Sequence, residues 1–151
     1  MNKVFPQTMA LELSEHFTDP KLKAIGKWGC CALVSLWIMG IEGDIGNICL
    51  VADEMGKGLD NECTVNWVKF FSNVAGRKIT VTFKEIKSLE ETKKCGRCAV
   101  RYDYNGKYHW VGVEKGKIAY NPLRHSVCVN YGKPTQLRII KSADGEEFKW
   151  N

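Results

Sequence analysis

The chain has 151 residues, of which 44% are hydrophobic and 26% charged, and this composition is typical of a single globular domain spanning residues 1–151. The net charge of +5 arises from 22 basic and 17 acidic residues that are scattered along the chain, so we expect no nucleic-acid partner. The apolar run from Cys30 to Met39 is too short to span a bilayer, and the N-terminal segment lacks the apolar core of a secretory signal. We therefore expect a cytoplasmic protein, or one released without a Sec signal, and no membrane partner.

Apolar residues recur at helical spacing in the first half of the chain. Gly40 is a plausible stop for the second helix, and the polar segment before Val65 offers N-caps for the fourth. The apolar set of the fourth helix includes Val68, which we expect to pack on a core. The four predicted helices are Met9–Phe17, Cys31–Met39, Asp44–Met55 and Val65–Val74.

After Gly76 the apolar period changes from helical to two, which indicates strands. Asn105-Gly106 is a strong hairpin signal, and the polar segment 84–94 predicts a short helix or loop. The predicted strands are Ile79–Phe83, Cys98–Tyr104, Lys107–Val113, Lys117–Tyr120 and Thr135–Lys141, and Glu147–Trp150 can pair at an edge. Helices followed by an antiparallel sheet predict an α+β domain.

Seven cysteines without an export signal argue against a disulfide framework. Cys95 and Cys98 form a CxxC motif, but a structural zinc site usually needs a second close pair. We therefore expect no metal and no cofactor, and a redox or metal protein built on this motif is the least favoured hypothesis. The cysteines lie at positions 30, 31, 49, 63, 95, 98 and 128.

The chain is organised around the segment 27–40, in which Gly29, Cys30 and Cys31 precede an apolar run. This pattern predicts a turn that delivers a cysteine to the start of a buried helix. The N-terminus of a helix carries partial positive charge, so a thiol there ionises more easily and becomes a better nucleophile.

His109 is the best candidate for a base that acts on such a thiol. Strand alternation places it on one face with Val111 and Val113, where a buried imidazole needs a polar partner. Asn121 ends the next strand and can supply the partner oxygen. A two-residue turn at 115–116 would place Asn121 opposite Trp110, on the wrong face, whereas a three-residue turn at 114–116 would place it opposite His109.

Cysteine at a helix start, histidine in a strand and asparagine at the end of the next strand resemble the papain-like cysteine peptidases. The matching patches are Gly29–Leu36 and His109–Val113, followed by Asn121-Pro122, and they are closest to small bacterial and phage relatives of the double-glycine, bacteriocin-processing peptidases. The resemblance implies a papain-like fold in which N-terminal helices pack on a C-terminal antiparallel sheet. It also implies a thiolate from Cys30 or Cys31, His109 as general base and Asn121 as the orienting group.

The resemblance leaves the nucleophile open. Ser35 follows Cys31 by four positions, as a small residue follows the nucleophile in the relatives, and this favours Cys31. Gly29 directly precedes Cys30, which favours that cysteine instead. We prefer Cys31, since adjacent side chains at a helix start point in different directions and only one should face His109. The relatives also carry an oxyanion-binding glutamine about six residues before the nucleophile, where this chain has Ala24 and Ile25.

These observations predict a cysteine hydrolase that cleaves a peptide or isopeptide bond in a peptide or protein substrate. The missing glutamine motivates the alternative, a catalytically inactive papain-like binding module, because loss of an oxyanion donor costs on the order of 100- to 1000-fold in rate. Of the other histidines, His16 is expected on an exposed helix, and His125 is the reserve base if His109 points away from the thiol.

Overall fold

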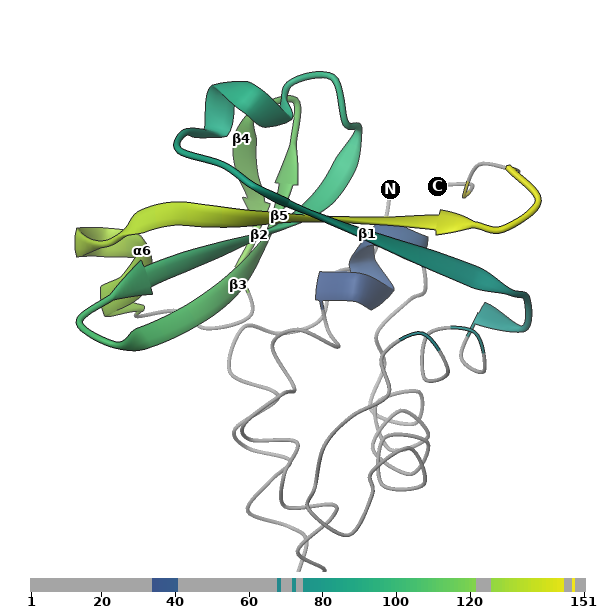
Figure 1. Ribbon diagram of the computed structural model, residues 1–151, viewed down its shortest axis with the longest axis horizontal. Helices are drawn as coiled ribbons and strands as arrows, with labels where there is room; N and C mark the ends of the chain where they lie inside the picture. Colours follow the sequence, from purple (N-terminus) through teal and green to yellow (C-terminus); the bar gives the residue numbers. More distant parts are fainter. Residues whose placement is uncertain are drawn as a thin grey trace, which may run out of the picture.

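The computed structural model describes residues 34–40, 68, 72, 75–121, 126–145 and 148. In this part of the chain a short helix at residues 34–39 packs on a five-stranded antiparallel sheet (Figure 1), which confirms the predicted α+β class. The remaining elements, in chain order, are β1 (Ile79–Glu85), the 3-10 helix η1 (Leu89–Thr92), β2 (Arg97–Tyr104), β3 (Lys107–Glu114), β4 (Lys117–Tyr120), α6 (Val127–Tyr131) and β5 (Lys133–Ser142).

The strand order is β1-β5-β2-β3-β4, so the last strand inserts between the first and the second. All five predicted strands are confirmed. β2 and β3 each extend one residue beyond their predicted bounds, and β1 and β5 extend further. Two tight turns connect β2, β3 and β4. Asn105-Gly106 and Lys115-Gly116 each have two residues with positive φ, as two-residue hairpin turns with the twist of the flanking strands require.

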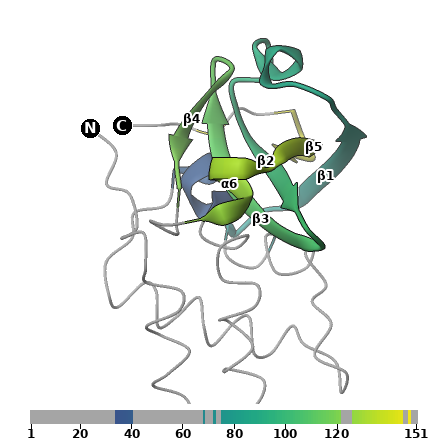
Figure 2. The ribbon, with the colours of Figure 1, turned by 90° about the vertical axis from the view of Figure 1, so that its left-hand side faces the viewer.

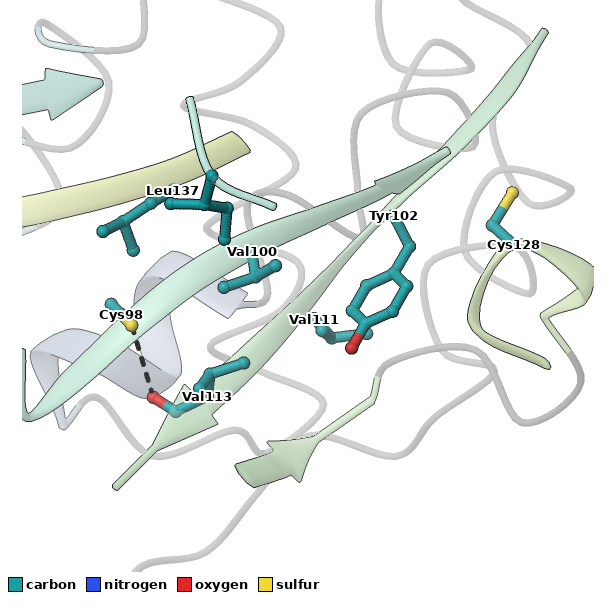
Figure 3. Close-up of a cluster of buried hydrophobic side chains, with 8 residues drawn as sticks. Cys98, Val100, Tyr102, Val111, Val113, Cys128 and Leu137 are labelled. Carbon is teal, nitrogen blue, oxygen red and sulfur yellow. Dashed lines mark hydrogen bonds between the residues drawn. The ribbon is translucent and has the colours of Figure 1, made fainter. Parts of the chain in front are cut away.

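One face of the sheet carries a cluster of buried hydrophobic side chains, and we call it the core face (Figure 3). β2 and β3 place Val100 opposite Val111 and Cys98 opposite Val113 on this face. Cys98 is fully buried, and its thiol donates a hydrogen bond to the carbonyl of Val113 at 3.7 Å. The core cluster consists of Ile86, Cys98, Val100, Tyr102, Val111, Val113, Cys128 and Leu137.

The helix at residues 34–39 packs on the opposite face, which we call the helix face. A Cβ atom added to Gly112 of β3 would lie 2.6 Å from a ring carbon of Trp37, so only glycine allows this approach. The Trp37 ring also stacks on Tyr120 of β4, with ring centroids 6.0 Å apart. Gly40 has φ of +73° and donates to the carbonyl of Trp37, which confirms it as the predicted helix stop.

Helix α6 was not predicted from the sequence, and Figure 2 shows it beside the sheet. The Ser126 side chain caps its first turn by accepting from the amide of Val129 at 3.4 Å. Its buried Cys128 belongs to the core cluster, and Figure 3 shows it at the margin of that cluster, on the side of Tyr102. The helix ends at Gly132, where an added Cβ would lie 2.3 Å from the carbonyl oxygen of Asp103. Tertiary packing therefore holds this single short turn in place.

The described residues include only parts of the other predicted helices. Residues 68, 72 and 75 are helical, consistent with the fourth predicted helix, but Val68 is 45% exposed and the prediction that it packs on a core is wrong. The predicted helices Met9–Phe17 and Asp44–Met55 lie outside the described residues. Of Glu147–Trp150 only Phe148 is described, and it lies outside any strand. Within the described ranges no helix is long and apolar enough to cross a membrane.

Candidate functional site

His109 occupies the third position of β3 and lies on the core face. It pairs with Tyr102 of β2, and both side chains are buried, with 6% and 7% of their surfaces exposed. Val111 follows on the same face, so an apolar wall borders the imidazole on the side of the core. This setting agrees with the predicted partly buried histidine next to valines.

Asn121 reaches His109 through a strand register that neither predicted alternative describes. The turn has two residues, since Glu114 pairs with Lys117, but the register shifts so that Gly112 pairs with Tyr120. Ala119 is the extra residue of this β-bulge, and continuing the register places Asn121 opposite Val111. The bulge therefore restores the alternation that a two-residue turn alone would have lost, and Asn121 shares a face with His109.

The two side chains form a short hydrogen bond. The Nε2 atom of His109 lies 2.7 Å from the Oδ1 atom of Asn121. Because an amide oxygen only accepts, Nε2 carries the proton and donates it to Asn121. The neutral ring then has its lone pair on Nδ1, and this atom is the one that can accept a proton.

The protonation equilibrium of His109 is displaced toward the neutral base. Burial lowers the pKa of His109 below its ordinary value of 6.5, and the hydrogen bond with Asn121 opposes part of that shift. At pH 7 the imidazole is therefore mostly unprotonated, which is the state that a general base requires.

The lowered pKa predicts a specific dependence of stability on pH. The unfolded chain binds the His109 proton more tightly than the folded chain, so the stabilisation is complete above pH 6.5 and is lost as the pH falls through the folded-state pKa. Wild-type protein should lose more free energy of unfolding between pH 7.5 and 5.5 than His109→Gln does. Denaturant titrations at the two pH values measure this difference, and equal losses in the two proteins would contradict it.

His109 lies beyond the end of β4. The paired residues of β4 extend along β3 only from Glu114 to Gly112, whereas β2 pairs with β3 over its whole length. At the level of His109, β3 is therefore the last strand of the sheet in the described part of the chain. His109 therefore lies at an edge of the described sheet, with 6% of its surface exposed.

The C-terminal end of the helix at residues 34–39 lies at one end of the β2–β3 hairpin, where Arg97 pairs with Glu114, and His109 lies toward the other end. The guanidinium of Arg97 donates to the carbonyl of Trp37 at 2.8 Å, and Arg97 pairs with Glu114 at the end of β3. Carbonyl groups point toward the C-terminus of a helix, so the helix runs toward Arg97. His109 lies five residues from Glu114 along β3, or about 17 Å at 3.4 Å per residue.

The described residues do not include the predicted nucleophiles. Cys30 and Cys31 lie outside them, as do Ala24 and Ile25 at the expected glutamine positions and the histidines His16 and His125. Ser35 is described and lies fully buried within the helix. The structure thus brings together two of the four predicted site residues, His109 and Asn121, and the roles of all four stay predictions.

The CxxC motif does not have the character of a reactive thiol pair. Burial raises the pKa of the Cys98 thiol to about 12, and the neighbouring Cys95 adds to the shift. A thiol with such a pKa is neither a ready nucleophile nor a ready metal ligand. Among the described residues no group of three potential ligands is placed to hold a metal ion. Cys98 is better explained as part of the core.

Sequence reasoning missed that Arg97 joins the helix to the β2–β3 hairpin, because its partners Trp37 and Glu114 lie far from it in the sequence. A pocket of about 490 Å³ is lined by Glu85, Arg101 and Gln136 among others, and neither His109 nor Asn121 contributes to it.

No model of a known family, no curated protein and no solved structure matches the chain.

Proposed function

We propose that the protein is a cysteine hydrolase of papain-like architecture that cleaves a peptide or isopeptide bond in a peptide or protein substrate. The observation that carries the proposal is the bond from His109 Nε2 to Asn121 Oδ1, which leaves Nδ1 as the basic atom. The lowered pKa of His109 supports it, because the ring is a base at neutral pH. Cys31, or alternatively Cys30, supplies the nucleophile.

The proposed reaction has two steps. Nδ1 of His109 accepts the thiol proton while the sulfur attacks the substrate carbonyl, and the imidazolium then donates that proton to the leaving amine as the C–N bond breaks. A water molecule attacks the thioester while His109 takes a proton from it, and His109 returns that proton to the sulfur as the C–S bond breaks, which releases the acid and regenerates the cysteine thiol. Asn121 holds the ring throughout and stabilises its charged form.

The faces of the sheet restrict how the thiol meets the ring. Trp37 packs on the helix face, whereas His109 lies on the core face. A direct approach through the sheet is impossible, so we propose that the thiol meets Nδ1 around the edge of β3, beyond the end of β4. The Trp37 carbonyl accepts from Arg97, which lies at the end of the β2–β3 hairpin opposite to His109, so the proposed route needs the chain before residue 34 to reach the edge of β3 next to His109.

A second candidate function is a binding module that keeps the fold without turnover. The observation that favours it is the placement of His109 next to the core cluster, where a histidine bonded to Asn121 could serve packing alone. The absence of glutamine at Ala24 and Ile25 points the same way. The two functions differ in whether a cysteine is activated.

Alkylation of the native protein distinguishes them. We expect iodoacetamide at pH 7 to modify Cys31 or Cys30 about tenfold faster than Cys95, the partly exposed thiol outside the proposed site. An ordinary thiol with a pKa near 8.5 is only about 3% ionised at this pH, so activation can raise its reactivity about 30-fold. Mass-spectrometric mapping of the seven cysteines over time gives the individual rates. Equal rates at all three cysteines would overturn the proposed hydrolase.

A further inference from the structure

We propose that Arg97 is a positioning residue of the proposed hydrolase, which fixes the helix at residues 34–39 against the hairpin that carries His109. The inference rests on the proposed function, since it concerns how the elements that bear the thiol and the base are held together. Three contacts of one guanidinium group carry it.

Arg97 binds the helix and the hairpin at the same time. Its Nη1 atom donates to the carbonyl of Trp37 at 2.8 Å, and its Nε atom donates to Glu114 Oε2 at 3.0 Å. The guanidinium also lies over the Trp37 ring, 4.5 Å from its centroid. The planar fork of an arginine can hold these acceptors together, whereas a lysine offers a single point charge.

The contacts are shielded from solvent, which makes them effective. The Arg97 side chain is 10% exposed and that of Glu114 is 35% exposed, so water competes weakly for the guanidinium. The carbonyl of Trp37 belongs to the last turn of the helix, where a cation is favoured by the helix dipole. Hydrogen bonds from a charged donor are also stronger than neutral ones.

These contacts fix the position of His109 relative to the helix. Glu114 and His109 lie on the same strand, and β3 is paired with β2 along the whole interval between them. Gly112 and Tyr120 hold the Trp37 ring from the hairpin side. Loss of Arg97 would free the C-terminal end of the helix, and a displacement of about 1 Å at a reacting group can cost on the order of 100-fold in rate.

The test compares Arg97→Met with a matched variant, Arg101→Met. Arg101 lies on the same strand and face, and it too forms an ion pair and stacks on an aromatic ring, but with Asp103 and Tyr108. We expect Arg97→Met to raise amide exchange in residues 34–40 at least tenfold and to slow alkylation of the fast cysteine about tenfold. Arg97→Lys should recover part of both, and Arg101→Met should leave both within about twofold.

Denaturation midpoints of all variants separate positioning from general stability. A fast wild-type cysteine whose rate is unchanged in Arg97→Met would overturn the role of Arg97 and leave the proposed function standing. Equal losses in Arg97→Met and Arg101→Met would overturn it as well, since they would report general destabilisation. A wild-type protein without a fast cysteine would overturn the proposed function, and the positioning role would fall with it.

Discussion

Replacing His109 with glutamine should slow alkylation of the proposed nucleophile at pH 7 by about 10- to 30-fold. The expected size follows from the ionisation of an unassisted thiol, which is about 3% at this pH if its pKa is near 8.5. Glutamine keeps an N–H donor that can bind Asn121 Oδ1 but offers no basic nitrogen, so it removes the base and retains a buried polar contact. Time-resolved mass mapping of the cysteines measures the change.

Two comparisons make this prediction specific. In the wild type the alkylation rate should rise with pH as His109 loses its proton, at a pKa below 6.5. This rise, the acid limb of the pH profile, should disappear in His109→Gln. Asn121→Ala should retain the limb but move it to lower pH, because the hydrogen bond with Asn121 raises the pKa of His109. If a fast cysteine keeps its rate in His109→Gln, the ring is not its base and the triad is wrong.

Local signals in the sequence were sufficient to predict the five strands and the turn between β2 and β3, but not the order of the strands in the sheet. Asn105-Gly106 predicts a two-residue turn because both positions need positive φ, and the observed angles of +48° and +76° agree. The alternation from Lys107 to Val113 predicts which residues share a face, and the pairing of Val111 with Val100 agrees with it. Such features depend on a few adjacent residues, so a single sequence contains them.

The link between His109 and Asn121 could not be derived from turn length. The bulge at Ala119 decides it, and nothing in the segment 117–121 signals an extra residue. Tyr120 must face Trp37 across Gly112 while Asn121 faces His109, and both demands are met only with the shifted register. The contact with Trp37 comes from an element far away in the sequence, so the correct pairing of His109 with Asn121 was predicted with the wrong register.

Tertiary packing also explains why helix α6 and the exposure of Val68 were not predicted from the sequence. Helix α6 has only five residues, too few for a periodic pattern, and depends on the Ser126 cap and on burial of Cys128. Val68 fits the apolar pattern of its helix but is exposed. Helical spacing predicts which residues share the apolar face of a helix, but it does not predict how far along that face the packing extends.

Gly112→Ala should destabilise the protein by about 1–3 kcal/mol, the usual cost of forcing an extra carbon into a packed site. The new Cβ would lie 2.6 and 2.7 Å from two ring carbons of Trp37, and 3.1 Å from the Cβ of Tyr120. Trp37 is 5% exposed and stacks on Tyr120, so its ring has little room to move. Denaturant titration of wild type and variant measures the loss in free energy of unfolding.

A double-mutant cycle with Trp37→Leu tests whether the clash is the cause. Removing the indole opens the space above Gly112, so Gly112→Ala should cost less in that background, with a coupling energy of about 1 kcal/mol or more. Additive losses would show that Gly112 matters for another reason. If packing of the helix at residues 34–39 on the helix face positions the proposed nucleophile, Gly112→Ala should also slow alkylation of that cysteine at pH 7. The variant leaves His109 and Asn121 unchanged. The close approach of Trp37 to Gly112 would then be required for thiol activation as well as for packing.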